Sequence, residues 1–217
     1  MDLVVPSLAR EVRCLCVALL CALFGLVTEA EAMSNPFFTG TQISSNDLAP
    51  FTKWSGALSR YEEQKAHAED YCTDSHCNVH QWEALLVTLK GKPVREQMDA
   101  VNRFFNAMPY VEDYANWGVD DYWETPYELM TRGGDCEDYA IAKYISLKRL
   151  GVPESAMRIL IVHDSNLGGE MHALLEVKLG GKPYILDNQA KSIAAENSIF
   201  HYRPIYAINE MAWWAYN

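Results

Sequence analysis

Apolar residues along the chain follow two different periods, and the period changes near residue 153. In the first part they recur at spacings of three and four, as in an amphipathic helix. Three such stretches cover residues 51–61, 79–89 and 94–105. A fourth, short helix is predicted from Pro126 to Thr131, because Thr125 suits an N-cap and a proline suits the first helical position.

The fifth predicted helix carries a cysteine in its first turn. It follows the turn formed by Gly133 and Gly134, has Asp135 at the N-cap position, and ends at Gly151. The helix dipole and the free N–H groups at a helix N-terminus favour negative charge, so Cys136 lies where the reactive thiolate is stabilised. A small residue near a helix cap would give the same pattern without any reactivity.

After Pro153 the pattern changes to short β-rich runs that are separated by turn residues. Strands are predicted at Met157–His163, Met171–Leu179, Tyr184–Gln189 and Tyr202–Asn209. Helices followed by an antiparallel sheet make an α+β fold, in which we expect the cysteine-bearing helix to pack on the sheet.

The turn between the second and third strands predicts which side chains share a face of the sheet. A two-residue turn at 180–181 pairs Leu179 with Lys182. In that register His172 and Asp187 are diagonal neighbours on the same face, whereas a slip by one residue would separate them. The sequence therefore predicts an Asp–His pair.

Cys136, His172 and Asp187 are the three parts that thiol catalysis requires. The thiolate attacks, the histidine acts as base and then as acid, and the carboxylate orients the histidine. His163 is an alternative base, but no aspartate can be placed on its face of the sheet. The alternative for His172 is a structural histidine in the core.

The first 32 residues have the pattern of a secretory signal peptide. Arg10 and Arg13 precede an apolar run at 14–27, and small residues follow up to Ala32. We expect cleavage after Ala32, export, and one mature domain at 33–217 with no stable membrane insertion. An uncleaved anchor is the alternative, but the apolar run is short for a bilayer span.

Outside the signal peptide the cysteines are Cys72, Cys77 and Cys136. In an oxidising compartment the close pair is expected to form a disulfide, which leaves Cys136 as a free thiol. Zinc is the alternative for the pair because histidines surround it, although their spacing matches no common zinc pattern. These histidines are His67, His76 and His80.

The chain is acidic, with 29 acidic and 18 basic residues and a formal net charge of −11. This charge argues against nucleic acid or an anionic membrane as a partner and suits cation binding. Tyrosine, tryptophan and aspartate are concentrated at 110–123, just before the cysteine helix. This segment is either a wall of a substrate site or a packed surface loop.

The run GGDCEDYAIAKY at 133–144, followed by His172 and Asp187 in that order, resembles the bacterial transglutaminase-like cysteine proteinases. The resemblance extends from about residue 82 to the end of the chain and includes the export signal. It implies a papain-like fold in its transglutaminase-type variant. It also implies that Cys136 is the nucleophile, His172 the base and then the acid, and Asp187 the orienting residue.

The resemblance implies dependence on Ca²⁺, with Asp135, Glu137 and Asp138 as ligands. Three carboxylates beside a thiol raise its pKa, and a hard cation bound by their oxygens would remove that effect. Helix capping is the alternative, because acidic residues favour a first helical turn in any case.

The resemblance further implies a periplasmic endopeptidase that cuts a large repeat-rich surface adhesin near its N-terminus, so that the cell leaves its biofilm. A partner is implied as well: the periplasmic domain of an inner-membrane cyclic-di-GMP receptor, which sequesters the protease. Two other classes of function stay open. One is a transglutaminase or amidase with the same triad, and the other is a non-catalytic binding protein, against which the intact triad argues.

Overall fold

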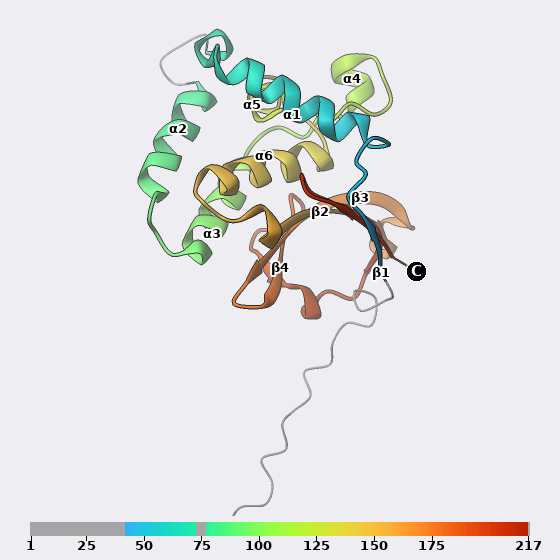
Figure 1. Cartoon of the computed structure of the whole chain (residues 1–217). Coiled ribbons are helices and arrows are strands. Elements are labelled where there is room, and N and C mark those ends of the chain that lie inside the picture. Colours follow the sequence, from blue (N-terminus) through green and yellow to red (C-terminus); the bar gives the residue numbers. More distant parts are fainter. Residues whose placement is uncertain (1–41, 73–76, 217) are drawn as a thin grey trace, which may run out of the picture. The chain divides into compact units, whose positions relative to one another are not determined.

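The structure is a computed structural model that describes residues 42–72 and 77–216. Helices lie on one side and an antiparallel sheet on the other (Figure 1), as predicted for an α+β fold. Within these two ranges, no helix has the length and apolar character needed to span a membrane. The predicted signal peptide, residues 1–32, lies outside the described residues.

The helical side carries the five predicted helices and one further short helix. Its elements are α1 (Thr52–Lys65), the 3₁₀ turn η1 (Ala68–Tyr71), α2 (Asn78–Leu89), α3 (Val94–Phe105), α4 (Asp113–Trp117), α5 (Pro126–Arg132) and α6 (Cys136–Arg149). The sequence did not predict α4, which lies in the acidic and aromatic segment. It ends at Gly118, whose φ of 72° is a left-handed conformation that glycine adopts without strain.

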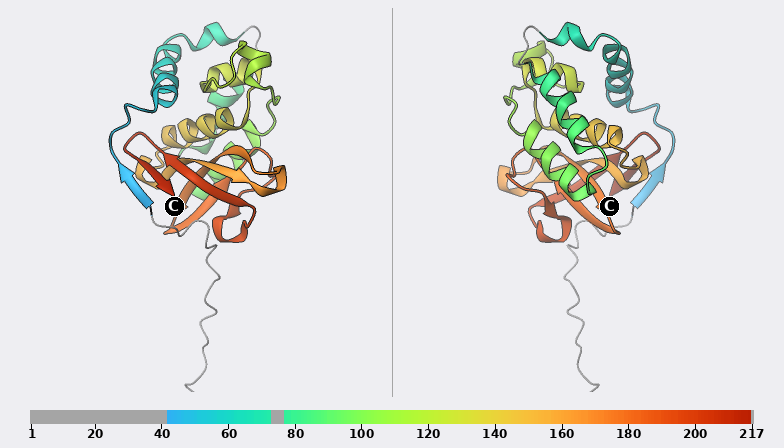
Figure 2. Two further views of the ribbon diagram at one scale, coloured as in Figure 1. Left: turned by 90° about the vertical axis from the view of Figure 1, so that its right-hand side faces the viewer. Right: turned by 90° about the vertical axis from the view of Figure 1, so that its left-hand side faces the viewer.

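The sheet combines the four predicted strands with three that were not predicted. The strands are β1 (Gln42–Ser45), β2 (Met157–Asp164), β3 (Glu170–Leu179), β4 (Lys182–Leu186), β5 (Ala194–Ala195), β6 (Tyr202–Ile208) and β7 (Trp213–Tyr216), with 3₁₀ turns η2 (Glu154–Ala156), η3 (Ser165–Leu167) and η4 (Glu196–Ser198). Their order is β1-β7-β6-β2-β3-β4-β5. Strand β1 pairs with β7, so the two ends of the described chain lie side by side (Figure 2).

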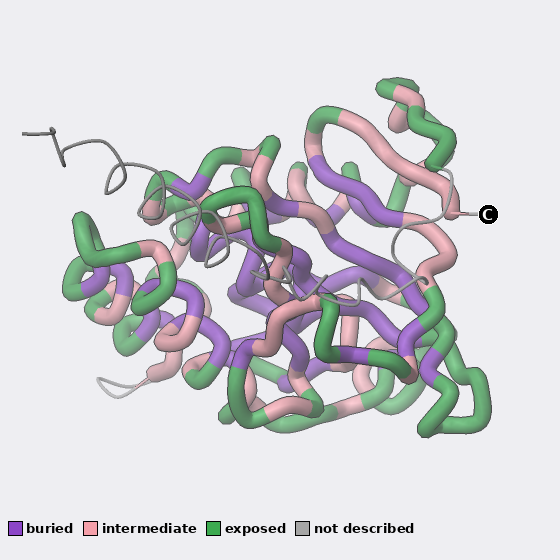
Figure 3. Tube along the Cα trace, turned by 90° about the horizontal axis from the view of Figure 1, so that it is seen from below, coloured by how far each residue is buried: buried purple, intermediate pink, exposed green. Residues whose placement is uncertain are grey.

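Helix α6 occupies the centre of the core and packs on β2 and β3. The buried residues of β2 alternate between the two faces of the sheet. Ile159 and Ile161 join the large core that includes the helices, while Leu160 and Val162 belong to a smaller cluster. Buried segments therefore run through the middle of the molecule, with exposed segments around them (Figure 3).

Cys72 and Cys77 form a disulfide between η1 and α2, as predicted. Cys136 is then a free cysteine. The disulfide removes two thiolates from the alternative zinc site. Of the histidines around the pair, His80 has its Nε2 3.0 Å from a carboxylate oxygen of Glu69, and His76 lies outside the described residues. His67 is described, but it is not in the group of possible ligands that Cys72, Cys77 and His80 form.

Candidate active site

A tight turn places the cysteine at the start of α6. Gly133 has a φ of 79°, and the Gly134 N–H donates to the carbonyl oxygen of Pro109 at 3.2 Å. A Cβ at Gly134 would lie 2.3 Å from Oδ2 of Asp138, so no side chain fits at this position. The glycine pair thus allows the chain to enter α6 close to buried acidic groups, with Cys136 as the first helical residue.

The β3–β4 hairpin brings the predicted histidine and aspartate together. Leu179 pairs with Lys182 across the turn, so the predicted register is confirmed. Strand β4 ends at Leu186, and Asp187 follows it directly. Nε2 of His172 lies 3.0 Å from Oδ1 of Asp187, and both side chains are buried.

The thiol lies beside this pair. Cys136 accepts a hydrogen bond from the backbone N–H of Ala173, the neighbour of His172 on β3, and its Sγ–H donates to Glu137 Oε2 at 3.1 Å. Cys136 and His172 line one pocket of about 480 Å³. Because Nε2 of His172 is taken by Asp187, Nδ1 is the ring nitrogen left for the thiol.

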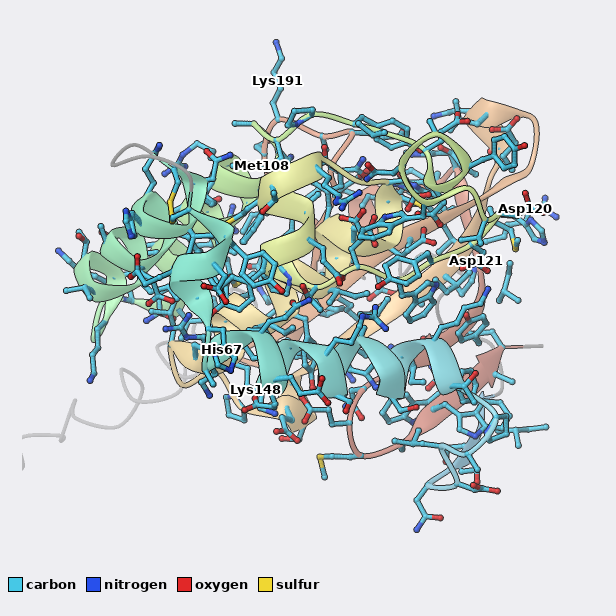
Figure 4. The ribbon with its side chains drawn as sticks, turned by 90° about the horizontal axis from the view of Figure 1, so that it is seen from above. His67, Met108, Asp120, Asp121, Lys148 and Lys191 are labelled. Carbon is cyan, nitrogen blue, oxygen red and sulfur yellow. A yellow bond between two sulfur atoms is a disulfide. The ribbon has the colours of Figure 1, made fainter. Side chains whose placement is uncertain are left out.

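The segment 110–123 forms the opposite wall of this pocket. Its pocket-lining residues are Tyr110, Glu112, Asp113, Tyr114, Asp120, Asp121 and Trp123. Figure 4 labels Asp120 and Asp121 at adjacent positions on the chain that leaves α4. Of the two interpretations of this segment, the structure supports a wall of the site.

His163, the alternative base, lies elsewhere. On β2 it precedes Asp164 and is paired with Met171 of β3, so its side chain is on the opposite face of the sheet from that of His172. Its ring is exposed, and its Nδ1 is 2.8 Å from the carbonyl oxygen of Gly169. His172 is therefore the histidine that the fold brings to the cysteine.

Negative charge dominates the start of α6. Burial, together with Glu137 and Asp135, raises the pKa of Cys136 above its ordinary value. Burial and Glu137 also raise the pKa of Asp135 to about 9, and burial raises the pKa of Asp113. The sequence predicted that the helix N-terminus favours the thiolate, but here the desolvation and the carboxylates outweigh the dipole.

Two groups of carboxylates in this region are close enough to share a cation. Glu137 meets Asp113 and Asp121 in one group, in which the three ligand oxygens lie within 4.8 Å of one another. Asp135 lies beside Glu137, and the buried atoms Asp113 Oδ1 and Asp135 Oδ1 have no hydrogen-bond partner among the described residues. This set of oxygen donors, with unpaired buried oxygens, fits a hard cation such as Ca²⁺.

Asp138 belongs to the second, fully buried group, with Asp113 and Glu124. Its Oδ2 accepts the N–H of Asp135 at 2.9 Å, and its Oδ1 accepts the N–H of Glu124 at 2.7 Å. Both oxygens thus hold backbone at the start of α6, so the structure favours helix capping for Asp138. Asp135 and Glu137 face the pocket, as the ligand prediction requires.

Comparison with known proteins decides the family. The family model "Bacterial transglutaminase-like cysteine proteinase BTLCP" matches residues 61–215. The chain belongs to this family. It is also similar to calcium-bound LapG from Legionella pneumophila, with 34% identity and a TM-score of 0.62, over 71% of this chain and 87% of that chain. A search of curated proteins found no match.

A second solved structure, EGTA-treated Legionella pneumophila LapG, gives the same 34% identity and TM-score of 0.62, over 71% of this chain and 84% of that chain. The α+β, transglutaminase-like fold that the sequence predicted is therefore confirmed. The protein is a member of a cysteine protease family.

Sequence reasoning missed several groups in the site of this cysteine proteinase. Asp113 and Asp121 belong to the segment 110–123. The high proportion of acidic residues in that segment was the only sign in the sequence that they could join the site. Tyr202, which contacts Asp187, carried no signal beyond its place in a predicted strand. Contacts between residues this far apart depend on the packing of the whole sheet.

Proposed function

We propose that this chain is a calcium-dependent cysteine endopeptidase in which Cys136, His172 and Asp187 form the catalytic triad. The observation that carries the proposal is the His172–Asp187 hydrogen bond of 3.0 Å beside the only free cysteine of the described residues. Cys136 begins α6, His172 lies on β3 and Asp187 directly follows β4, and the pocket that Cys136 and His172 line supports their joint action.

The proposed reaction follows from this geometry. Nδ1 of His172 takes the thiol proton of Cys136 as the sulfur attacks the scissile carbonyl carbon, and the imidazolium then protonates the leaving amine. Water, activated by the same nitrogen, hydrolyses the thioester. Asp187 holds the ring by Nε2 and stabilises its positive form. The N–H of Cys136, in the first turn of α6, has no intrahelical acceptor and suits an oxyanion donor.

Calcium is assigned to the carboxylates at the pocket: Asp113, Asp121, Asp135 and Glu137 would hold it. When bound, the ion supplies positive charge that compensates the carboxylates beside the thiol. Glu137 would then accept less strongly from the thiol of Cys136, and the thiol could pass its proton to His172. The calcium-bound form of the similar Legionella protein supports calcium binding by this chain.

The substrate and the cellular setting are proposed from the family resemblance. We infer export to the periplasm by the predicted signal peptide at 1–32. There the enzyme would cut the N-terminal region of a large repeat-rich adhesin and release it, which promotes biofilm dispersal. The periplasmic domain of an inner-membrane cyclic-di-GMP receptor would hold the protease in check.

The test uses mature protein, residues 33–217, with an N-terminal fragment of a repeat-rich adhesin from the same cell. Parallel samples contain Ca²⁺, EGTA, or the Cys136→Ala variant with Ca²⁺. We expect one cut that requires both Ca²⁺ and Cys136. Cleavage that persists in EGTA would refute the calcium assignment and leave the triad.

Absence of cleavage, with folded protein and a reduced thiol, would contradict the endopeptidase. A labelled primary amine in the same samples then separates the remaining classes. Its Cys136-dependent incorporation into the fragment would identify a transglutaminase, and tight binding of the fragment without any reaction would identify a binding protein.

A further inference from the structure

Tyr202 of β6 contacts the proposed triad from the sheet. Its hydroxyl donates to Oδ2 of Asp187 at 2.6 Å, and its side chain is 2% exposed. The centroids of the Tyr202 and His172 rings are 5.7 Å apart. The tyrosine is therefore next to both members of the Asp–His pair.

The two oxygens of Asp187 have different partners. Oδ1 accepts from Nε2 of His172 at 3.0 Å and from the N–H of Gln189 at 2.8 Å. Among the described residues, the only hydrogen bond to Oδ2 comes from Tyr202. Rotation of the carboxylate about its χ2 angle would break all three bonds, so the Tyr202 hydroxyl helps to fix the direction in which Oδ1 points.

The backbone of Asp187 is held independently of this bond. The side-chain amide of Asn106, at the end of α3, donates to the carbonyl oxygens of Asp187 and Ala190 at 2.8 and 3.0 Å. The main chain after β4 is therefore held from the helical side. Loss of the Tyr202 hydroxyl would free the carboxylate without freeing the segment that carries it.

We propose that Tyr202 is a positioning residue of the triad, which keeps the Asp187 carboxylate ionised and its Oδ1 aimed at His172. The inference rests on the proposed thiol chemistry. A buried hydroxyl requires a hydrogen-bond partner, and a bond to a charged acceptor is stronger than one to a neutral acceptor. A phenylalanine would fill the same space in the small core cluster, so packing alone does not account for a tyrosine here.

The charges around Asp187 agree with this role. Burial opposes ionisation, but the bonds from His172, Tyr202 and Gln189 outweigh it and hold the pKa of Asp187 below its ordinary value. The buried side chain of Lys143, on α6, also interacts electrostatically with the Asp187 carboxylate. Asp164 and Cys136 also act electrostatically on the Tyr202 hydroxyl, and the centroid of the His201 ring lies 4.1 Å from that of the Tyr202 ring.

The test is the alkylation of Cys136 by iodoacetamide as a function of pH, with Ca²⁺ present throughout. This reaction reports formation of the thiolate–imidazolium pair and needs no peptide substrate. In Tyr202→Phe we expect the acidic limb of the profile to move to higher pH by about one unit, and alkylation at neutral pH to fall about tenfold. Protonation of Asp187 at higher pH is the reason for the direction of the shift.

Tyr61→Phe is the matched control. Tyr61 is also a buried tyrosine, but its hydroxyl has no hydrogen-bond partner among the described residues and lies on the helical side. Its profile should match that of the wild type. A Tyr202→Phe profile identical to those of the wild type and of Tyr61→Phe would overturn the proposal.

A second comparison separates positioning from general damage to the fold. In the Asp187→Asn background, Tyr202→Phe should change the alkylation rate by less than about twofold, because the two residues act through one bond. A full tenfold loss in that background would overturn the role assigned to Tyr202.

If Tyr202→Phe does not fold, 3-fluorotyrosine at position 202 keeps the size of the ring and makes the hydroxyl a stronger donor. The acidic limb should then move to lower pH, and an unchanged limb would contradict the proposal. Alkylation is measured without a substrate. Failure of adhesin cleavage would therefore refute the proposed function, while the alkylation profiles would still test the role of Tyr202.

Discussion

Two carboxylate environments flank Cys136, and they differ in how their negative charge is compensated. On the sheet side, Asp187 accepts three hydrogen bonds from protein groups, and its pKa lies below the ordinary value. On the loop side, burial and neighbouring carboxylates raise the pKa of Asp135 to about 9. There Asp113 and Asp135 each keep one buried oxygen without a partner among the described residues.

The difference shows in which half of the site the protein's own groups compensate the negative charge. Hydrogen bonds from His172, Tyr202 and Gln189 favour the charged form of the Asp187 carboxylate without an external ion. The loop-side carboxylates repel each other and raise the pKa of the thiol, so this half requires a bound cation or a bound proton. Under the proposed function, a bound Ca²⁺ would therefore act on the loop side of Cys136 only.

The largest effect is expected when the Asp187 carboxylate on the sheet side is removed. In Asp187→Asn, His172 loses the carboxylate that orients its ring and stabilises its positive form. The turnover number for adhesin cleavage should fall by about 10³–10⁴-fold, and added Ca²⁺ should not restore it. The control is Asp99→Asn on the surface of α3, which removes a carboxylate paired with Arg95. Activity within tenfold of the wild type would argue against the triad.

Removing the proposed Ca²⁺ from the loop-side carboxylates should have the next largest effect. We expect EGTA to lower the cleavage rate by about 10–100-fold, since the charges beside Cys136 then favour the thiol. Ca²⁺ at 100 times its dissociation constant should stabilise the fold by about 2.7 kcal/mol in thermal unfolding.

Asp135→Asn and Glu137→Gln should each reduce this stabilisation, and Glu62→Gln, an exposed substitution on α1, should not. Isothermal titration calorimetry measures the affinity directly. Undiminished calcium binding in the Asp135→Asn, Glu137→Gln double variant would refute the assigned ligands.

A smaller shift is expected in the pKa of Cys136 itself. Negative neighbours raise the pKa of the thiol, so neutralising them with Ca²⁺ should lower it, by about one unit. The iodoacetamide profile of the wild type should therefore move to lower pH when Ca²⁺ replaces EGTA. In Asp135→Asn the shift between the two conditions should be smaller, and a shift of full size would show that another group mediates the effect.

The smallest effect concerns Lys143, a buried residue on the same side of the site as Asp187. Burial lowers its pKa to about 7, and its Nζ has no hydrogen-bond partner among the described residues. The unfolded chain binds the proton of Lys143 more tightly than the folded chain does. The residue therefore lowers the free energy of unfolding, by its full amount below pH 7 and by progressively less as the pH rises towards 10.5.

Lys143→Met should therefore stabilise the fold, by about 1–2 kcal/mol at pH 6 and by less at pH 9.5. Urea unfolding at the two pH values measures this difference. Lys90→Met, an exposed substitution at the end of α2, is the control and should show no such pH dependence. A gain in stability that is equal at both pH values would mean that Lys143 is not buried as an ammonium.

Local patterns predicted most of the helices and the central strands because each depends on residues near one another in sequence. The glycine turn at 180–181 was enough to set the register of β3 and β4, and the Asp187–His172 pair follows from it. In contrast, β1 and β7 were missed, since each is four residues long and the two pair with each other from opposite ends of the described chain.

The sequence by itself predicted Cys136 at a helix N-terminus and the His172–Asp187 pair, because a helix N-terminus and a two-residue hairpin turn are local features. Only the tertiary structure decided which acidic residues meet Glu137, that Asp138 holds backbone instead, and that Tyr202 reaches Asp187. These contacts join elements far apart in the chain, and the distances between such elements depend on packing across the whole core.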